Sequence, residues 1–331
     1  MVVPPSGPMN IPPPQHMLQP HSLHPLMTNN AWLVELIASL TARPVEEVCQ
    51  RLHAEEHQIG SNVNVAMQRM GITPHHWSAE LVRFYEQTDA FIYELIAWNR
   101  NANKVAIRQW LNEVLARLPG FSQNVLTYGD GIGCDSLYLT QAGHRVTYCD
   151  LGELSERFAQ ALFAAAGLPF ESHRDLGALP AGAYNAIVCL DVLEHVPDPA
   201  SLVEQLARCL KPGGILIVSA PFFAVGTEFP THLASNMHHS GSLSKLYGRF
   251  GLQLVDGRPF HDPLVLSKSP VVYAPGAWGW WRRTAVRAGG LVLTAARYWS
   301  WPHRRIGRML QRRGYRYYTE GLQPAVAVGA K

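Results

Sequence analysis

The sequence predicts an α/β protein with a doubly wound, mostly parallel sheet behind a helical N-terminal extension. Three observations support this fold class. From about residue 121, short apolar strands alternate with helix-length segments, the pattern of a sheet built from βα units. A glycine-rich turn follows the first of these strands. Before residue 120, apolar residues instead recur at three- and four-residue spacing, as they do in amphipathic helices.

Composition limits the class of protein. The chain has 331 residues, 47% of them hydrophobic, and a net charge of +3, which suits an ordinary globular protein. Its five cysteines are widely spaced with no CxxC pair, so they predict free thiols in a reducing compartment rather than disulfides or a zinc site. No signal-peptide pattern and no apolar run of about 18 residues occur. These features predict a cytoplasmic protein without a transmembrane segment.

The chain divides into four predicted parts. Residues 1–30 are rich in Pro and His and lack apolar periodicity, so we expect disorder there. Residues 31–120 form the helical extension, which includes a long amphipathic helix, Ser78–Asn99, and a further helix, Asn103–Leu118. Residues 121–274 form the sheet domain, and residues 275–331 form a basic, aromatic-rich C-terminal segment.

Within the sheet domain, five strands precede a predicted helix, Ser240–Phe250, and two more apolar segments follow near Leu252–Val255 and Val265–Val272. Helices are expected to begin near Asp135, Glu153 and Pro199. The five predicted strands are Asn124–Tyr128, Arg145–Cys149, Glu171–His173, Asn185–Leu190 and Ile215–Ala220.

The C-terminal segment concentrates positive charge. It holds ten arginines and Lys331 against one acid, Glu320, which gives it a formal charge of +10 and leaves −7 on the remaining chain. We favour a cap folded against that acidic remainder. Peripheral membrane contact and nucleic-acid contact are the alternatives, because tryptophans and tyrosines are interleaved with the arginines. Gly289, Gly290, Pro302 and Gly307 argue against one long uninterrupted amphipathic helix.

A candidate binding turn follows the first strand of the sheet domain. Gly129, Gly131 and Gly133 alternate in the sequence Tyr-Gly-Asp-Gly-Ile-Gly, which allows a tight turn and close approach of a ligand to the backbone. The next strand ends at Asp150, an acid placed to accept both hydroxyls of a ribose. Together they predict an adenosine-type cofactor. NAD-dependent oxidoreductases share both features, so the cofactor class stays open at this point.

The fourth strand separates these alternatives. It continues into Leu-Asp-Val-Leu-Glu-His-Val-Pro-Asp-Pro, which ends at Pro199, and Leu-Lys-Pro-Gly-Gly follows the next helix at residues 210–214. This succession resembles the class I S-adenosylmethionine (SAM)-dependent methyltransferase family. The likeness is greatest to the small-molecule branch typified by ubiquinone-pathway O-methyltransferases. It covers residues 124–221 most closely and implies a seven-stranded Rossmann-like methyltransferase sheet.

The resemblance also implies a set of cofactor-binding residues. The three glycines would border the methionine and ribose parts of SAM, and Asp150 would hold the ribose hydroxyls. Residues near the adenine and the methyl group would follow the second, third and fourth strands. The predicted set is Tyr128, Gly129, Gly131, Gly133, Asp150, Leu151, Asp175, Leu176, Leu190 and Asp191. The chain departs from the family pattern at Thr127 and Asn185, where most members carry acids.

Methyl transfer requires an aligned nucleophile and, for some acceptors, removal of a proton. His195, His232 and His238 are the candidate general bases, since histidine titrates near neutrality. A divalent metal is a less favoured alternative. Asp191, Glu194 and His195, joined by His232 or His238, resemble the E-x-x-E-H group of some metal-assisted methyltransferases, and the metal ligands stay unknown.

Aromatic residues on the long predicted helix of the extension have two interpretations. Tyr85, Tyr93 or Trp98 would form an aromatic wall over the donor pocket, attracting the sulfonium of SAM. Simple core packing is the favoured interpretation, because aromatic residues at helical spacing commonly face a core.

The sequence therefore predicts an enzyme that transfers a methyl group from SAM to an O, N or C atom of a small metabolite or peptide-like natural product in specialised metabolism. S-adenosylhomocysteine is the expected product. The alternatives are a non-catalytic SAM-binding or interaction protein and an NAD-dependent oxidoreductase. The helical extension also makes a homodimer an expectation.

Overall fold

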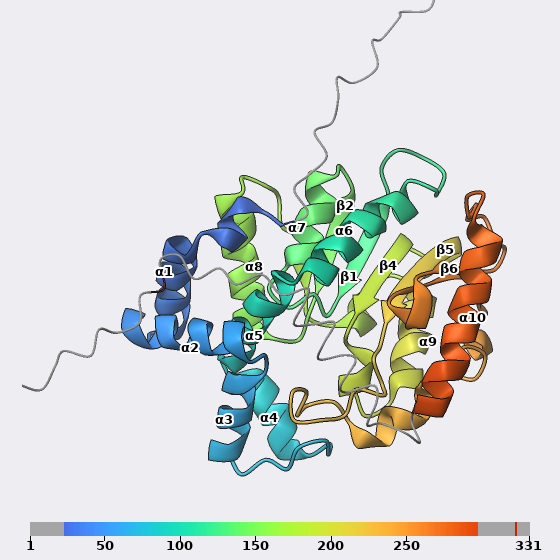
Figure 1. The fold of residues 1–331 in the computed structure, drawn as a ribbon. Coiled ribbons are helices and arrows are strands. Elements are labelled where there is room, and N and C mark those ends of the chain that lie inside the picture. The colour runs from blue at the N-terminus through green and yellow to red at the C-terminus, as the bar shows by residue number, and fades with distance from the viewer. Residues whose placement is uncertain (1–22, 297–321, 323–331) are drawn as a thin grey trace, which may run out of the picture.

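The computed structural model describes residues 23–296 and residue 322. A seven-stranded sheet lies at the centre, with helices on both faces (Figure 1). The N-terminal helices gather at one side of the sheet, and the last described helix, α10 (Gly279–Ala296), lies along the opposite side. This arrangement confirms the predicted fold class: a doubly wound, mostly parallel sheet preceded by helices.

The strands follow the order β3-β2-β1-β4-β5-β7-β6, and β7 is antiparallel to both of its neighbours. The order reverses between β1 and β4, which is where ligands bind in open α/β sheets. The strands are β1 (Asn124–Tyr128), β2 (Arg145–Cys149), β3 (Ser172–His173), β4 (Tyr184–Leu190), β5 (Leu210–Ser219), β6 (Leu252–Gly257) and β7 (Leu264–Lys268).

Both faces of the central strands are buried. One face of β1 and β4, including Val125 and Val188, packs against α6 (Ala102–Leu115) and α7 (Cys134–Gln141). The other face, including Leu126 and Ile187, packs against α9 (Pro199–Cys209). Continuous apolar strands are expected where helices cover both faces of a parallel sheet. The apolar runs that predicted the strands thus arise from burial on both sides.

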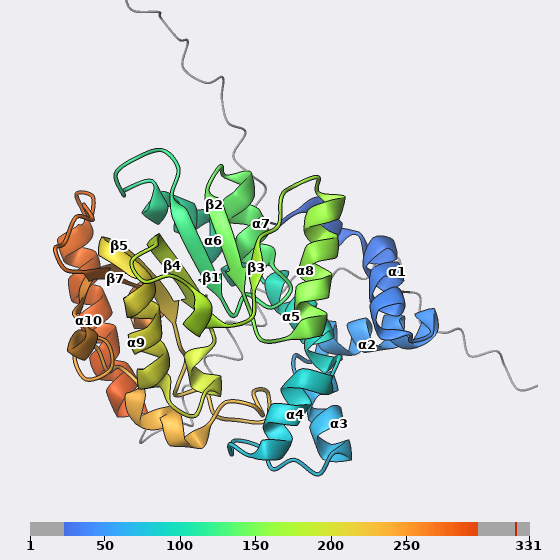
Figure 2. The ribbon, with the colours of Figure 1, turned by 180° about the vertical axis from the view of Figure 1, so that it is seen from behind.

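Five helices of the extension precede α6. They are α1 (Asn30–Thr41), α2 (Val45–His57), α3 (Ser61–Arg69), α4 (Ala79–Gln87) and α5 (Ala90–Asn99). α1, α2 and α5 share one apolar cluster with α7 and with α8 (Glu153–Ala165). Figure 2 shows α1 beside α8 at the edge of the sheet domain. The extension therefore packs directly on the sheet domain.

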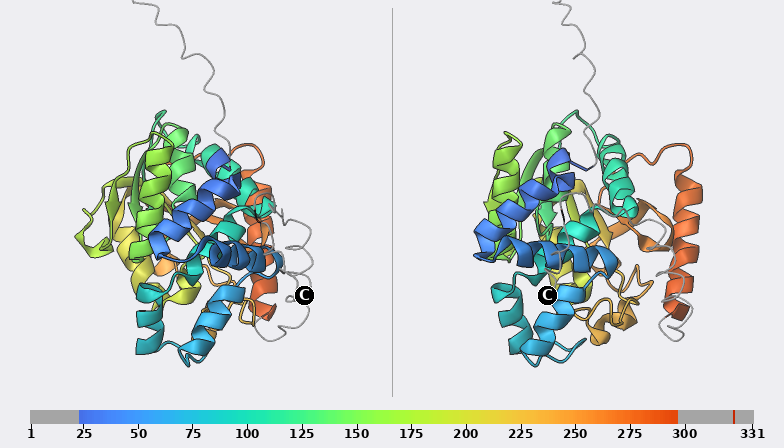
Figure 3. Two further views of the ribbon diagram at one scale, coloured as in Figure 1. Left: turned by 90° about the vertical axis from the view of Figure 1, so that its left-hand side faces the viewer. Right: turned by 60° about the vertical axis from the view of Figure 1, so that its left-hand side comes forward.

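A buried ion pair also ties the start of the extension to its end. The Arg100 guanidinium, which is fully buried, pairs with the Glu56 carboxylate and donates a 2.8 Å hydrogen bond to the Met27 carbonyl. Removing either charge would leave the other without its counter-charge in the core, which is costly. Side views show α1 and α2 crossing in front of the sheet domain (Figure 3).

The predicted helix Ser78–Asn99 is wrong as a single element. It divides into α4 and α5 because the chain becomes extended at Thr88. The Thr88 hydroxyl accepts a 3.1 Å hydrogen bond from the Ala90 amide, which caps the second helix. The neighbouring Asp89 carboxylate is held by Arg43 and Arg51 from the α1–α2 region. Short polar side chains that bond to nearby backbone compete with helix continuation.

Two further expectations need correction. Disorder over residues 1–30 does not extend to residues 23–30, which form a 3-10 turn, Pro25–Thr28, and the start of α1, with Met27 buried. The predicted helix Ser240–Phe250 is only a 3-10 turn at Gly248–Phe250. Gly241 has φ +73° and would place a Cβ 2.1 Å from the Gly290 carbonyl of α10, so the chain bends there instead of forming a helix.

The five predicted strands are confirmed, with β3, β4 and β5 differing in length from the prediction. The expected segments near Leu252–Val255 and Val265–Val272 correspond to β6 and β7. Of the basic C-terminal segment, the structure describes α10, whose Arg282 pairs with the buried Asp256 at 2.6 Å. Residues 297–321 and 323–331 lie outside the described residues. The four-part division of the chain stays a prediction.

All five cysteines are free, and four of them are buried. Among the described residues, no helix combines the length and the apolar character that crossing a membrane requires.

Candidate active site

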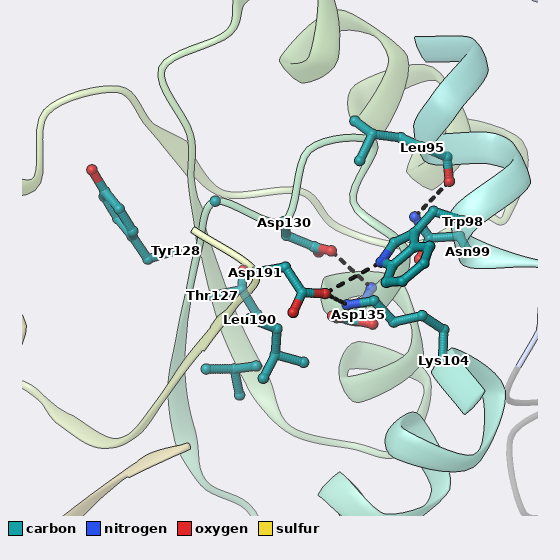
Figure 4. A pocket seen from close by; sticks show the side chains of 12 residues that line it. Leu95, Trp98, Asn99, Lys104, Thr127, Tyr128, Asp130, Asp135, Leu190 and Asp191 are labelled. Atoms are coloured by element: carbon teal, nitrogen blue, oxygen red, sulfur yellow. Dashed lines mark hydrogen bonds and ion pairs between the residues drawn. The ribbon is translucent and has the colours of Figure 1, made fainter. Parts of the chain in front are cut away.

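A pocket opens where the sheet order reverses, at the carboxyl ends of β1 and β4 (Figure 4). The two strands supply one side, and α5 and α6 of the extension supply the other. The lining residues are Leu95, Trp98, Asn99, Lys104, Thr127, Tyr128, Gly129, Asp130, Asp135, Val188, Leu190 and Asp191. The extension is therefore part of the pocket wall.

The glycine turn requires its glycines. Gly129 has φ +72° and Gly131 has φ +57°, both in the left-handed region that residues with a Cβ rarely adopt. A Cβ at Gly131 would lie 2.6 Å from Leu95 of α5. The Tyr148 hydroxyl on β2 donates a 2.6 Å hydrogen bond to the Gly131 carbonyl, and this bond anchors the turn to β2. The turn thus brings bare backbone to the pocket edge.

Asp150 follows β2 and faces this turn. One carboxylate oxygen accepts a hydrogen bond from the Gly131 amide and the other accepts one from the Gly152 amide, each at 2.9 Å. Burial raises the pKa of Asp150 above its usual value, although these amides oppose the shift. The Leu151 amide also lowers the pKa of this carboxylate, so three backbone amides surround it. A carboxylate has about four lone-pair sites, so at least one is left for a further donor such as a ribose hydroxyl.

The remaining predicted cofactor residues surround this edge of the sheet. Leu151 is 72% exposed, beside Asp150, and Leu176 is buried. The Asp175 carboxylate accepts a 2.8 Å hydrogen bond from the Gly177 amide and caps the short turn after β3. Figure 4 shows the Tyr128 side chain on the other side of the β1 end from Asp191. Gly133, at φ +79°, begins α7.

Asp130 is a pocket residue that the sequence analysis missed. Its carboxylate accepts hydrogen bonds from the amides of Asp135 (3.1 Å) and Ser136 (2.7 Å) at the start of α7. Ser136 also bonds to Thr127 at 2.7 Å, so Thr127 and Asp130 share one network. Burial, followed by the nearby Asp135 carboxylate, raises the pKa of Asp130. The signal was available: Asp130 is the acid between the first two glycines of the turn.

Asp191 lines the pocket directly after β4. Its backbone has φ +58°, a left-handed conformation uncommon for a non-glycine residue. The carboxylate pairs with the Lys104 ammonium at 2.8 Å and accepts hydrogen bonds from Ser219 (2.7 Å) and Trp98 (3.2 Å). Figure 4 shows Lys104 and Trp98 converging on it from the extension. Strain of this kind is common at ligand-binding positions.

Lys104 is the second residue that the sequence analysis missed. It is 6% exposed, and burial alone would lower the pKa of its ammonium. The carboxylates of Asp191 and Asp135 outweigh that effect, so the pKa of Lys104 is raised and the side chain is charged. Although burial opposes it, Lys104 correspondingly lowers the pKa of Asp191. A lysine on a predicted helix gives no sign of which side it faces, so only the packing of α6 places this charge in the pocket.

Three titratable side chains form a second cluster beyond Asp191. Glu194 and His195 lie on a 3-10 turn, Leu193–His195, and His232 comes from the segment after β5. The Nε2 atoms of His195 and His232 are each 3.9 Å from the same Glu194 oxygen. One ligand atom from each of the three residues lies within 4.8 Å of the others.

The charges of this cluster are unusual. Glu194 is 1% exposed, and neither of its carboxylate oxygens has a hydrogen-bond partner in the described structure. Burial raises the pKa of Glu194 well above its usual value. Burial also lowers the pKa of His195 to about 4 and that of His232 well below its usual range. At neutral pH both imidazoles are therefore uncharged and able to donate a lone pair.

Neighbouring segments hold these side chains in place. The Tyr85 hydroxyl of α4 lies 3.2 Å from His195 Nδ1. The Leu233 amide donates a 3.0 Å hydrogen bond to the Glu194 carbonyl, which joins the segment after β5 to the turn after β4. The His75 imidazole lies 2.9 Å from the His232 carbonyl oxygen. The extension thus supports both the cluster and the pocket at the switch point.

The structure separates the predicted catalytic and metal-ligating residues. His195 and His232 come together with Glu194, whereas His238 is exposed on the 3-10 turn Ala234–His239, and its Nδ1 lies 2.6 Å from the Ser235 carbonyl oxygen. His238 is therefore wrong as a member of this cluster. Asp191 is also wrong as a cluster member, since Lys104 and its other partners hold its carboxylate.

The predicted aromatic wall is present only in part. Trp98 lines the pocket and Tyr85 reaches the histidine cluster, whereas Tyr93 is fully buried in the core of the extension. The two interpretations therefore apply to different residues: Tyr93 packs in the core, whereas Trp98, on the same helix α5, lines the pocket.

The pocket lies at the switch point of a doubly wound sheet, the usual place of a ligand site in this fold class. The methyltransferase domain family matches residues 98–320, two thirds of the chain. The chain therefore belongs to the class I SAM-dependent methyltransferase family. This match also decides between the two enzyme classes that share the glycine turn, in favour of methyltransferases over NAD-dependent oxidoreductases.

Curated relatives agree with this family. The ubiquinone biosynthesis O-methyltransferase of Bordetella avium (strain 197N) is 33% identical over 144 residues, covering 40% of this chain and 59% of the relative. The protein of the same name from Xanthomonas axonopodis pv. citri is 32% identical over 165 residues, covering 44% and 69%. The chain thus spans about three fifths of the first relative's length. Phosphoethanolamine N-methyltransferase 2 of Haemonchus contortus, solved with SAM, is 16% identical at a TM-score of 0.40, covering 52% and 44%.

Proposed function

We propose that the protein transfers the methyl group of SAM to an oxygen atom of a small metabolite. The observation that carries this proposal is the pocket at the switch point, with the Asp150 carboxylate facing the glycine turn beside it. Family membership supplies the donor class, and the names of the O-methyltransferase relatives favour oxygen over nitrogen or carbon. Catalysis would rest mainly on alignment, because the donor is already activated.

The donor would occupy the pocket from its adenosine end to its methionine end. Asp150 would accept the two ribose hydroxyls, with Leu151, Asp175 and Leu176 beside the adenine. Gly129, Gly131 and Gly133 would allow the donor to approach the backbone, and Tyr128 and Leu190 would contact it from the strand ends. These assignments rest on the placement of all nine residues along the carboxyl edge of β1 to β4.

The methionine end of the donor would meet the Lys104 ammonium and the Asp130 carboxyl group. Lys104 would pair with the donor carboxylate, and Asp130 would accept from the donor ammonium. Asp130 would then replace the acid that Thr127 lacks, since the two residues lie in one network through Ser136. The pair Lys104–Asp191 would loosen as the donor enters, so that Asp191 and Trp98 face the sulfonium. Aromatic faces and carboxylates both attract such a cation.

The acceptor would lie toward His195 and His232. A base whose pKa is about 4, as at His195, removes a proton from a hydroxyl only weakly. The acceptor hydroxyl must therefore be acidic by itself or made so by a neighbouring charge. A cation held by Glu194 and the two histidines would supply such a charge.

The cluster Glu194, His195 and His232 fits a divalent cation. Two neutral imidazole nitrogens and a buried carboxylate without hydrogen-bond partners form a donor set suited to such an ion. The bound ion would lower the pKa of an acceptor hydroxyl. His195 would present Nε2 to the site and donate through Nδ1–H to the Tyr85 hydroxyl, which orients the ring.

Calorimetric titration with SAM, S-adenosylhomocysteine and NAD tests the donor site. Binding of the two sulfur compounds and not of NAD is expected. Transfer of labelled methyl from SAM to catechol, measured with Mg²⁺ and with a chelator, then tests the acceptor chemistry. Donor binding without transfer to catechol or to a panel of hydroxylated metabolites would support a non-catalytic SAM-binding protein instead. An unchanged rate in chelator would remove the metal from the proposal.

A cytoplasmic location, a role in specialised metabolism and a homodimer belong to the same proposal. Light scattering of the purified full chain tests the dimer directly. A monomer mass across the concentration range would remove it.

A further inference from the structure

Helix α10 packs on the edge of the sheet domain through one narrow face. Val286 is fully buried and Leu293 is 5% exposed on this face. Gly289 and Gly290 allow the segment around Phe260 and His261 to approach the helix backbone, since a Cβ at either position would lie 2.7 Å from these residues. Figure 1 shows α10 along the outside of the molecule, at the far side of the sheet from the extension. Its opposite face therefore points away from the protein.

That outer face is apolar, unlike the polar face expected of a surface helix. The preceding Trp278 is 68% exposed, and the helix itself exposes Trp280 (59%), Trp281 (60%), Leu291 (74%) and Val292 (47%). The two indoles of the helix contact each other edge to face, with ring centroids 4.7 Å apart. We call these five residues the α10 patch. A cluster of exposed tryptophans and aliphatic residues marks an interaction surface.

The charges around the α10 patch have one sign. Residues 275–296 contain three arginines and no acid, and seven further arginines follow in sequence before Glu320. Arg282 is held by Asp256, and Arg283 lies 3.4 Å from the Val255 carbonyl oxygen. Arg287 is exposed. The α10 patch is thus an apolar surface accompanied by basic side chains. Of the three α10 arginines, Arg282 alone pairs with a carboxylate of the described residues.

We infer that the α10 patch docks on an anionic lipid surface. Indole rings are favoured at the headgroup level of a bilayer, aliphatic side chains enter the acyl boundary, and arginines at the margin attract anionic headgroups. A second copy of the chain fits less well, because two basic margins would repel each other on docking. Nucleic acid fits less well because this face exposes five large apolar side chains and one arginine, Arg287, whereas binding to phosphates depends on several cations.

Vesicle flotation of the full chain tests this inference. Vesicles of phosphatidylcholine with phosphatidylglycerol should carry the protein, and those of phosphatidylcholine alone should carry much less. The double variant Trp280→Ser/Leu291→Ser should bind anionic vesicles at least about tenfold more weakly. Arg287→Gln should weaken binding by roughly fivefold, the usual effect of one arginine near an anionic surface.

The matched control is Trp77→Ser/Phe121→Ser. It removes one exposed tryptophan and one exposed large apolar residue outside α10, at 45% and 103% exposure. This control should bind vesicles as the wild type does, and circular dichroism should show all variants folded. Failure of the wild type to bind anionic vesicles would overturn the inference. Equal binding by wild type and the α10 double variant, or a loss of dimer in that variant without any vesicle binding, would overturn it as well.

Discussion

Replacing Asp150 by alanine provides the sharpest test of the donor site. In the structure each carboxylate oxygen accepts one backbone amide, from Gly131 or from Gly152, at 2.9 Å. The remaining lone pairs of the carboxylate would accept hydrogen bonds from the ribose hydroxyls. Each hydrogen bond to a charged group is worth about 1.5–3 kcal/mol, so two of them amount to about 3–6 kcal/mol. The Kd for SAM should therefore rise about 10²- to 10⁴-fold.

Calorimetric titration of wild type and Asp150→Ala with SAM and S-adenosylhomocysteine measures this change. Both ligands carry the same ribose, so both should lose affinity to a similar extent. Glu153→Gln is the matched control, because it removes a nearby acid whose carboxylate is largely exposed. It should leave the Kd within about threefold of the wild type.

One side effect has to be measured separately. The alanine variant leaves the amides of Gly131 and Gly152 without their carboxylate partner, which costs about 1–3 kcal/mol of folding free energy. Thermal melting shows whether the variant is still folded at the titration temperature. A folded Asp150→Ala protein that binds SAM within about threefold of wild type would refute the assignment of Asp150 to the ribose.

Three further substitutions test other parts of the site. Lys104→Met leaves the Asp191 carboxylate without its counter-charge, so the free energy of unfolding should fall by roughly 3 kcal/mol, measured by urea denaturation, and SAM binding should weaken. Glu194→Gln should abolish Mn²⁺ binding, measured by calorimetry. Without metal, the variant should also melt at a higher temperature than wild type at pH 8. In wild type, each unit by which folding raises the Glu194 pKa lowers the unfolding free energy by about 1.36 kcal/mol once the pH exceeds the folded-state pKa. Gly133→Ala places a Cβ 2.7 Å from the Ala159 Cβ at φ +79°, which should lower the unfolding free energy by at least about 1–2 kcal/mol.

The sign of the Glu194 effect depends on pH. Its folded pKa is raised above the ordinary value of 4.5, so the protonated acid is favoured in the folded protein. The associated stability is present below the unfolded pKa and is lost as pH rises through the folded pKa. Wild type and Glu194→Gln should thus melt at similar temperatures near pH 4 and diverge toward pH 8. Parallel melting curves at both pH values would contradict the raised pKa.

The affinity for a metal ion should depend on the protonation state of Glu194. A cation binds the ionised Glu194, so its apparent affinity should increase with pH and about one proton should be released on binding. Calorimetry in two buffers of different ionisation enthalpy counts that proton. His238→Ala is the control, since His238 lies outside the cluster and should leave metal binding unchanged.

Local sequence determined much of the sheet and the glycine turn. Strands buried on both faces appear as continuous apolar runs, and their carboxyl ends meet at one edge of a parallel sheet. The turn at Gly129–Gly133 and the acid at Asp150 therefore fell at predictable places. The helix break at Thr88 was less predictable, because the apolar spacing continues across it and only the contacts of Asp89 with Arg43 and Arg51 fix the new direction.

The tertiary structure alone decided which polar side chains meet. His232 and His238 are six residues apart and look alike in sequence, yet the bend after β5 buries the first against Glu194 and leaves the second exposed. Lys104 lies in the pocket because α6 packs on the sheet. There it pairs with Asp191, which sequence spacing had grouped with Glu194 and His195. Spacing along a chain determines which residues share a strand end or helix face. Contacts between segments far apart in sequence depend on packing, and packing here placed the charges that the proposed chemistry needs.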